Sequence, residues 1–306
     1  MAKPAFRAGT IHIRVPATCA NLGPGFDALG LALALYDDVV ARIGDDGLVV
    51  DVAGEGADDL PRDDSHLVVR AMRAVFERFG GQPRGIELVC ANRIPHGRGL
   101  GSSAAAIVAG VLIGRALVVG GDGNLDDDDV LALAAELEGH PDNVAPCLLG
   151  GLTVAWTDDA DEGRADAVRL DVDPAITPVV LVPPTPASTD EARRALPEQV
   201  SHADATFNSS RSALLVAALT GRREALLTAT DDRLHQPYRA DVMPESAALV
   251  AKLRAAGLPA VVSGAGPSVL VLARSGAEAD AAAARVPDGW RAERVAVDPD
   301  GAQIVR

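Results

Sequence analysis

PHGRGLGSSAAA, residues Pro95–Ala106, is the most informative stretch of this sequence. It lies between a predicted strand and the longest apolar helical pattern of the chain. Glycines at alternate positions (Gly97, Gly99 and Gly101) let the backbone adopt positive φ and approach a ligand without a Cβ clash. The next residues, Ser102 and Ser103, open the predicted helix, where unpaired N–H groups and the helix dipole attract an anion. The sequence therefore predicts an anion-binding loop. The alternative is a tight connection between strand and helix that binds no ligand.

The two commonest nucleotide-binding loops do not fit this stretch. A Walker A loop needs Gly-Lys-Ser/Thr, but the lysines of this chain are Lys3 and Lys252, and neither is near the loop. A Rossmann fingerprint needs GxGxxG, whereas the spacing here ends one residue too early. The loop is therefore predicted to belong to another class of phosphate site.

Strands and helices alternate along the rest of the chain, which indicates a mixed fold. Alternating or continuous apolar runs predict strands at Ile11–Val15, Ile86–Val89, Leu152–Trp156, Val179–Val182 and Val269–Leu272. Helical periodicity predicts helices at Leu67–Phe79, Ser103–Val118, Val130–Glu138, Ser212–Leu219 and Glu245–Ala256. The acidic run Asp126–Asp129 is interpreted as the N-terminal cap of the third helix rather than as a metal site.

A change in composition predicts a division of the chain near residue 157. The stretch Thr157–Asp166 is acidic and polar, and Pro174–Pro186 is rich in proline. We therefore expect two domains, residues 1–157 and residues 158–306. A chain of 306 residues is long enough for two domains of ordinary size with buried cores.

Composition narrows the classes of partner. The formal net charge is −15, and such a surface repels nucleic acids and anionic membranes. The apolar stretch Ala104–Gly121 approaches the length of a membrane span, but Arg115 and three glycines within it favour a buried core helix. Without a signal-like N-terminus, the protein is predicted to be soluble and cytoplasmic, with no nucleic-acid or membrane partner.

The three cysteines, Cys19, Cys90 and Cys147, show neither CxxC spacing nor partner histidines. This pattern builds neither a disulfide framework nor a zinc site, so we expect buried, reduced thiols.

PHGRGLGSSAAA resembles the second motif of the GHMP kinase superfamily, P-x-G-x-G-L-G-S-S-A, at every fixed position. This resemblance implies an α+β fold of two domains, the first ribosomal protein S5 domain 2-like and the second ferredoxin-like, with the active site in the cleft between them. It also implies that the loop wraps the phosphates of ATP and that Ser103 helps to hold Mg²⁺. The loop residues concerned are Pro95, His96, Gly97, Arg98, Gly99, Leu100, Gly101, Ser102, Ser103, Ala104 and Ala105.

VPATCANLGPGFDALGLAL, Val15–Leu33, is similar to the first motif of the homoserine kinase family within that superfamily. By position, the resemblance implies that Asn21 and Asp27 contact an amino acid substrate. The chemistry agrees, because a carboxylate neutralises an ammonium group and an amide reads a carboxylate or hydroxyl. Without the family resemblance, the sequence would predict that Asn21 forms an Asx-turn and that Asp27 caps a helix.

The block EGHPDNVAP, Glu138–Pro146, resembles a third element of the same family. The resemblance implies that Glu138 completes the Mg²⁺ site with Ser103, and oxygen ligands suit this hard cation. It places Asp142 near the substrate hydroxyl and Asn143 near the transferred phosphate. Asp142 is the evident candidate for a general base, or else a positioning group. We interpret His140, beside Pro141 in a turn, as structural.

Three elements of the C-terminal half extend the likeness. STDEAR (Ser188–Arg193) and QPYR (Gln236–Arg239) are similar to substrate-contacting elements, which implies roles for Thr189, Arg193 and Arg239. Two guanidinium groups suit the carboxylate of an amino acid. SGAGPS (Ser263–Ser268) resembles a third motif that packs against the phosphate loop. The sequence departs from the family pattern at His66. This residue lies within Ser-His-Leu-Val, where the family often has Asn-Leu-Val near the adenine. The residues that contact the adenine are therefore left open.

The resemblance as a whole implies a homoserine kinase, which transfers phosphate from ATP to L-homoserine and gives O-phospho-L-homoserine for threonine biosynthesis, with Mg²⁺ as cofactor. A mevalonate-type or sugar-type relative is disfavoured by the amino-acid-binding residues above. A catalytically silent sensor would be expected to lack Glu138, Ser103 or the loop glycines, and none is missing. The resemblance also suggests a homodimer.

Overall fold

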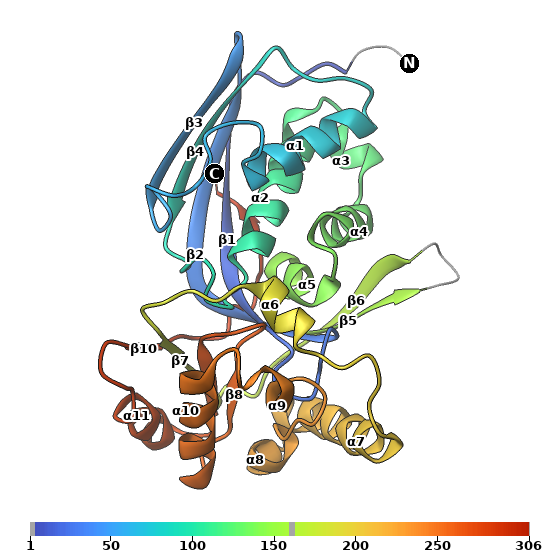
Figure 1. Cartoon of the computed structure of the whole chain (residues 1–306). Coiled ribbons are helices and arrows are strands. Elements are labelled where there is room, and N and C mark those ends of the chain that lie inside the picture. The colour runs from blue at the N-terminus through green and yellow to red at the C-terminus, as the bar shows by residue number, and fades with distance from the viewer. Residues whose placement is uncertain (1–3, 159–162, 306) are drawn as a thin grey trace.

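The computed structural model describes residues 4–158 and 163–305 and contains two β-sheets, one in each half of the molecule (Figure 1). The larger, seven-stranded sheet has the order β11-β1-β2-β4-β3, with β5 added to β2 and β6 added to β5. Its strands are β1 (Thr10–Ala20), β2 (Leu29–Gly44), β3 (Gly47–Gly54), β4 (Gly85–Asn92), β5 (Leu152–Asp158), β6 (Arg164–Leu170) and β11 (Gln303–Ile304). The pairs are antiparallel except β3 with β4.

Helices cover one face of this sheet, as Figure 1 shows for α1, α2, α4 and α5. Their bounds are α1 (Leu67–Arg78), α2 (Ser102–Leu117), α3 (Gly121–Asn124), α4 (Asp127–Glu138) and α5 (Pro141–Leu149). The apolar helix α2 is buried among them, and its glycines permit close packing. A Cβ at Gly110 would meet the Val68 carbonyl, and one at Gly114 would lie 2.9 Å from the Val75 side chain, so α1 packs directly on these glycines.

The second sheet has four antiparallel strands in the order β10-β7-β9-β8. Its strands are β7 (Thr177–Val182), β8 (Ala260–Val262), β9 (Val269–Ala273) and β10 (Arg291–Arg294), and α10 (Pro244–Ala255) and α11 (Gly276–Ala283) pack against it. The remaining elements are α6 (Thr189–Arg194), α7 (His202–Leu219), the 3₁₀ turn Arg223–Ala225, α8 (Leu226–Ala229) and α9 (Gln236–Arg239). This β-α-β-β-α-β succession agrees with the expected ferredoxin-like half.

Two features bear on the predicted domains 1–157 and 158–306. Strand β6 follows residue 157 but pairs with β5 in the larger sheet, and the smaller sheet begins only at Thr177. The division at 157 stays a prediction. Residues 159–162, within the acidic stretch used to place it, lie outside the described residues.

The predicted helices and strands are all present, with ends shifted by a few residues, and α7 begins earlier than expected because Ser201 caps it. The acidic run is confirmed as a cap: the Asp126 and Asp129 side chains accept each other's backbone N–H in a capping box. The three cysteines are confirmed as buried free thiols. The long strand β2, β3 and α5 are missing from the prediction. Within residues 4–158 and 163–305, no helix has both the length and the apolar character needed to cross a membrane.

Candidate active site

A cavity of about 330 Å³ lies where the two halves of the molecule meet. It is lined by residues from segments far apart in the sequence. They are Asn21, Asp27, Gly97, Gly99, Leu100, Gly101, Ser102, Ser103, Glu138, His140, Asp142, Asn143, Thr189, Arg193, Arg239, Gly264 and Ala265. All the residues that we assigned to substrate, metal or chemistry therefore line one cavity.

Hydrogen bonds to the main-chain carbonyls of the loop Pro95–Ala105 hold it against the smaller half of the molecule. The Ser263 hydroxyl donates to the Gly99 carbonyl at 2.6 Å, and the Ser268 N–H donates to the Arg98 carbonyl at 3.3 Å. Gly99 has φ +70°, and a Cβ there would overlap the Ser263 carbonyl oxygen. Only glycine fits both the positive φ and the close approach. The predicted packing of Ser263–Ser268 against the loop is thus present.

Gly101 marks the point where the loop becomes helix α2. It is the N-cap of α2 in the left-handed conformation, with φ +71°. A Cβ at this position would overlap the Thr18 hydroxyl and lie 3.2 Å from Oδ1 of Asn143. Thr18 itself donates to that Oδ1 at 2.8 Å. The absence of a side chain at Gly101 therefore lets Thr18 fix Asn143 directly beside the start of α2.

Ser103 and Glu138, the two residues assigned to the metal, are in direct contact. The Ser103 hydroxyl donates to Oε1 of Glu138 at 2.6 Å, joining the first turn of α2 to the last residue of α4. Burial raises the pKa of Glu138, although the hydrogen bond from Ser103 acts in the opposite direction. A hydroxyl and a carboxylate oxygen side by side form a donor set that suits Mg²⁺.

Asp142 is almost completely buried and paired with His140. Nδ1 of His140 lies 2.6 Å from Oδ1 of Asp142, across the N-terminus of α5. Burial by itself would lower the pKa of His140, but the hydrogen bond and charge of Asp142, with the charge of Glu138, raise it. His140 thus lines the cavity and holds Asp142, a contact that is compatible with the structural role expected of it.

The turn between β1 and β2 carries Asn21 and Asp27 in strained conformations, with φ of +67° and +52°. Asn21 spans the junction: its Nδ2 donates to the Gly264 carbonyl, and its Oδ1 accepts the Asp27 N–H, both at 2.9 Å. Asp27 does not cap a helix. Its carboxylate instead accepts two hydrogen bonds from Arg193, at 3.1 and 3.3 Å.

The two arginines differ in setting. Arg193, in α6, is partly exposed and paired with Asp27. Arg239, in α9, is 2% exposed, and its Nε donates to the Ala192 carbonyl at 3.0 Å. Thr189 begins α6 at the rim of the cavity and is exposed. The site therefore places one buried and one partly exposed guanidinium beside the carboxylate of Asp27.

The other loop residues face in different directions. Arg98 points away from the cavity lining and donates to the carbonyls of Pro183 and Pro184, tying the loop to the proline-rich segment. Pro95 and Ala104 are buried. His96 and Ala105 line a second, smaller cavity.

That second cavity, of about 200 Å³, lies on the far side of the helix start and shares Ser102 and Ser103 with the first. Its lining is mostly apolar. It also contains His66, which is 4% exposed and whose two ring nitrogens have no partner among the described residues. A buried donor and acceptor without partners in an apolar pocket suit a flat polar ligand.

Asp37 also lines this pocket and accepts the N–H groups of Arg93 and Ile94 at 2.6 and 2.9 Å. Burial raises its pKa to about 6, against these two hydrogen bonds. The folded protein then binds this proton more tightly than the unfolded chain, so the contribution of Asp37 to stability is largest at acid pH and is lost as pH rises towards 6.

We expect Asp37→Asn, which keeps the acceptor oxygen, to abolish that pH dependence. The unfolding free energy of the variant relative to the parent should rise by about 2 kcal/mol from pH ~4 to pH ~7, at 1.36 kcal/mol per pKa unit. Urea unfolding at a series of pH values measures it. Asp51→Asn, at an exposed position of β3, is the matched control. A constant difference across the series would contradict the raised pKa.

Two functional features were missed by reasoning from the sequence. Thr18, which fixes Asn143, stands inside the first motif as the Thr of Pro-Ala-Thr, so the motif carried a signal for it. His140 was interpreted as structural because of its neighbouring proline. Its contact with Asp142 depends on how α5 starts, which the letters do not reveal.

Comparison with known proteins gives a consistent result. Residues 66–151 match the model of the GHMP kinases N terminal domain, and residues 214–292 match that of GHMP kinases C terminal. The homoserine kinase of Streptomyces avermitilis is 59% identical over 305 residues, covering 100% of this chain and 99% of the relative. That of Clavibacter michiganensis is 52% identical over 299 residues, covering 96% and 93%. The crystal structure of homoserine kinase from Cytophaga hutchinsonii has a TM-score of 0.82 at 29% identity and covers 97% of both chains.

Proposed function

Because the chain belongs to the homoserine kinases, within the GHMP kinases, we propose that the cavity between its two halves is where it transfers a phosphoryl group from ATP to the hydroxyl of L-homoserine. The product is O-phospho-L-homoserine, a precursor in threonine biosynthesis. One observation carries this assignment: Gly97 and Gly99–Ser103 of the loop line the same cavity as the residues that we assign to the amino acid.

The acceptor side of the cavity is complementary to a zwitterion. In our proposal, Asp27 binds the substrate ammonium group, while Arg193 and Arg239 bind its carboxylate. The existing Asp27–Arg193 pair holds both charges ready, and an amino acid would insert between them and exchange one ion pair for two. Thr189 and Asn21 complete the lining, with Asn21 chiefly fixing the turn that carries Asp27.

The phosphate side uses the backbone. The N–H groups of Gly99–Ser103 at the start of α2 would bind the phosphate oxygens of ATP. Ser103 and Glu138 would hold Mg²⁺, which would supply positive charge to neutralise the charge that develops in transfer. Asn143, fixed by Thr18, would contact the transferred group. We further propose that the apolar pocket with His66 takes the adenine ring, because it adjoins the loop and offers unpartnered ring nitrogens.

Asp142 would receive or orient the proton of the substrate hydroxyl. Its carboxylate is held by His140 at 2.6 Å, so its orientation is fixed before the substrate arrives. Phosphoryl transfer relies mainly on positioning and charge stabilisation, so a hydrogen bond from the hydroxyl to Asp142 is sufficient.

A coupled assay of ADP release tests the function directly. We expect turnover with L-homoserine to exceed that with L-threonine, L-serine, mevalonate and galactose. Equal turnover with several of these alcohols, or none with homoserine, would refute the substrate assignment.

Asp27→Asn isolates the contact with the ammonium group. We expect KM for homoserine to rise about 10- to 100-fold, the loss of one hydrogen bond between charged groups, while KM for ATP stays constant. Steady-state kinetics with each substrate varied in turn measures the split. Asp190→Asn, on the exposed first turn of α6 beside Thr189, is the control. A parallel rise in both KM values would count against the assignment.

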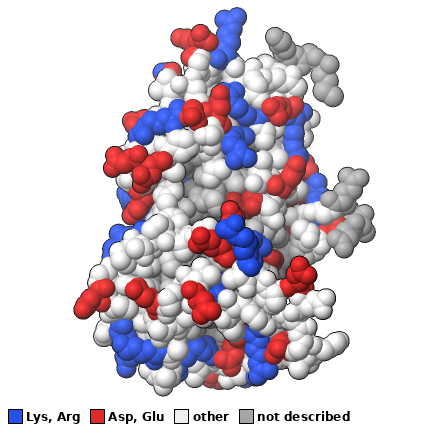
Figure 2. Space-filling model, viewed as in Figure 1, with Lys and Arg blue, Asp and Glu red and all other residues white. Residues whose placement is uncertain are grey.

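We also propose that the protein is a cytoplasmic homodimer without nucleic-acid partners. The net charge of −15 disfavours binding to polyanions. Figure 2 shows acidic and basic side chains interspersed over the face that it presents, with no continuous basic surface there. Analytical ultracentrifugation tests the dimer, and a shift assay with duplex DNA tests the second point.

A further inference from the structure

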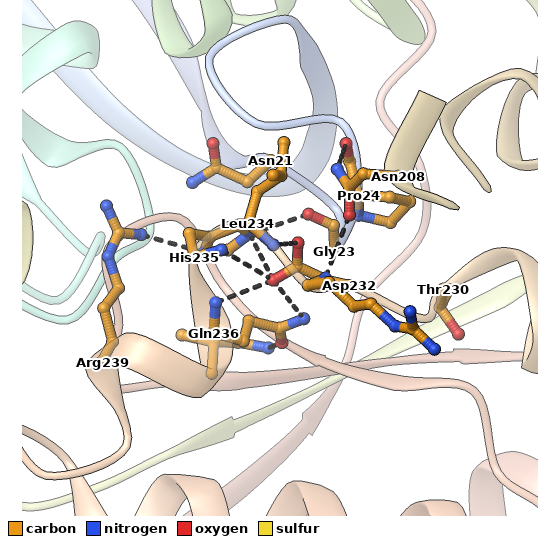
Figure 3. A network of polar contacts seen from close by, with 12 residues as sticks. Asn21, Gly23, Pro24, Asn208, Thr230, Asp232, Leu234, His235, Gln236 and Arg239 are labelled. Atoms are coloured by element: carbon orange, nitrogen blue, oxygen red, sulfur yellow. Dashed lines mark hydrogen bonds and ion pairs between the residues drawn. The ribbon is translucent and has the colours of Figure 1, made fainter. Parts of the chain in front are cut away.

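A buried histidine outside the cavity lining connects its two sides. His235 is 0% exposed and lies between the turn that follows β1 and the guanidinium of Arg239, as Figure 3 shows. Its Nε2 is 2.7 Å from the carbonyl oxygen of Gly23, and its Nδ1 is 3.1 Å from Nη1 of Arg239. Both ring nitrogens are therefore engaged.

These two partners fix the tautomer. A guanidinium nitrogen only donates, so Nδ1 of His235 must accept from Arg239. The ring proton is then on Nε2, where it donates to the Gly23 carbonyl. Burial lowers the pKa of His235, and the charge of Arg239 acts in the same direction, although Asp232, 3.4 Å from Nε2, opposes them. The imidazole is thus a neutral acceptor towards Arg239.

The backbone around His235 is held by Asp232. The Asp232 carboxylate accepts N–H groups from Leu234, His235 and Gln236, at 2.8, 3.2 and 2.7 Å (Figure 3). Further support comes from Phe26, whose ring stacks on the imidazole with centroids 5.2 Å apart. The imidazole has little freedom to turn, so its acceptor points in one direction.

Arg239 is held on two of its three nitrogens. Nε donates to the Ala192 carbonyl and Nη1 to His235, with a longer contact of 3.4 Å to the Gly264 carbonyl. The main-chain carbonyls fix where the guanidinium lies, whereas the His235 contact fixes the orientation of its plane. An arginine with free rotation would lose entropy on binding a ligand, and one already oriented does not.

We propose that His235 is a positioning residue for substrate recognition: its Nδ1 acceptor orients Arg239 so that Nη2 faces the carboxylate of the amino acid. This inference rests on the proposed function of the cavity. His235 touches neither substrate nor ATP in this scheme, and its effect passes wholly through Arg239. A histidine serving only as core packing would affect stability and both substrates alike.

Two replacements separate these roles. In His235→Asn, the amide oxygen reaches the place of Nδ1 and can accept from Arg239. In His235→Gln, the amide nitrogen reaches the place of Nε2 and can donate to Gly23, but the acceptor for Arg239 is lost. We expect His235→Gln to raise KM for homoserine about tenfold or more, with kcat and KM for ATP unchanged within error.

His235→Asn should keep KM for homoserine close to the parent value, although its smaller side chain leaves the larger cavity and should lower Tm more. The variant that loses more stability is then the one that keeps its KM for homoserine. If the asparagine variant raises KM as much as the glutamine variant, or if KM for ATP rises in parallel, His235 is only structural and the inference is overturned.

Arg239→Lys tests the carboxylate assignment of Arg239 by itself. Combined with His235→Gln, it shows whether the role of His235 fails while that assignment holds. Lysine cannot present a planar fork, so KM for homoserine should rise in this variant. Adding His235→Gln should then produce no further rise, because the two changes remove the same interaction. A multiplied effect would overturn the role of His235 alone. An unchanged KM in Arg239→Lys would overturn the carboxylate assignment of Arg239 and the inference with it.

Discussion

Replacing Glu138 by alanine is expected to lower kcat about 10³-fold, a loss of about 4 kcal/mol of transition-state stabilisation. Glu138 is the carboxylate that we assign to Mg²⁺, and its partner Ser103 donates to it at 2.6 Å. Without Glu138, the Mg²⁺ ion that would neutralise the charge developing on the phosphate oxygens would lose one of the two protein ligands assigned to it. The measurement is kcat at saturating ATP and homoserine over a series of Mg²⁺ concentrations.

Glu136→Ala is the matched control, since Glu136 lies on the same helix but its side chain is 72% exposed and pairs only with Arg78 among the described residues. An exposed pair of this kind contributes little to stability. The control should keep full activity, and both variants should unfold near the parent Tm because Glu138 ends α4. Full activity of Glu138→Ala at saturating Mg²⁺ would remove Glu138 from the metal site.

Gly101→Ala should lower kcat/KM for ATP on the order of 10²-fold, because displacing a positioned group by about 1 Å has effects of this size. The added methyl would overlap the Thr18 hydroxyl and approach Asn143, which Thr18 holds. Either the loop or Asn143 must move, and both are assigned to the phosphate. Kinetics with ATP varied and a thermal melt measure the effect on function and on stability.

Gly120→Ala is the control for Gly101→Ala. It separates the cost of backbone strain at positive φ from the steric overlap of the added methyl group. Gly120 is likewise an N-cap glycine in the left-handed conformation, with φ +80°, but a Cβ added there would lie 3.6 Å from its nearest neighbour, the side chain of Asn124. Both variants carry the cost of positive φ, about 1–2 kcal/mol. Only the change at Gly101 also meets a neighbour. Equal kinetics in the two variants would show that the methyl at Gly101 is accommodated.

The sequence placed the candidate residues in short, local motifs, and the structure brings these residues to one cavity. Ser102 and Ser103 begin α2 as expected, and Asp126 caps α4. The grouping of Asp27 with Arg193, 166 positions apart, came from resemblance rather than from periodicity. Local sequence patterns carry no information on contacts between residues so far apart in the chain, and only the fold brings these residues together.

Helix α5 shows why the position of Asp142 could not be predicted from the sequence. Its prolines indicated a turn, yet Pro141 occupies the first helical position, where no N–H is needed. Pro146 leaves the Asp142 carbonyl without its usual helical donor, and that carbonyl packs against Gly30 of β2. The position of Asp142 thus depends on a contact between a helix and a strand far earlier in the chain, a contact with no local signal.

The tautomer of His235 is a similar case. The letters His-Gln-Pro-Tyr-Arg place it four residues before Arg239, but the second partner, Gly23, is 212 residues away. The Arg239 contact places the ring proton on Nε2, but the carbonyl that accepts this proton belongs to a turn in the other half of the chain.

The contact between Gly99 and Ser263 has a consequence for how this enzyme could change. In the function that we propose, the nucleotide is bound chiefly by peptide groups, which substitutions leave in place, whereas the acceptor alcohol is recognised by individual side chains. Selection can therefore alter the acceptor without rebuilding the phosphate cradle. A directed-evolution library confined to Asp27, Thr189 and Arg193 should yield kinases for new alcohols that retain the parent KM for ATP, and randomising the loop glycines should yield few active clones.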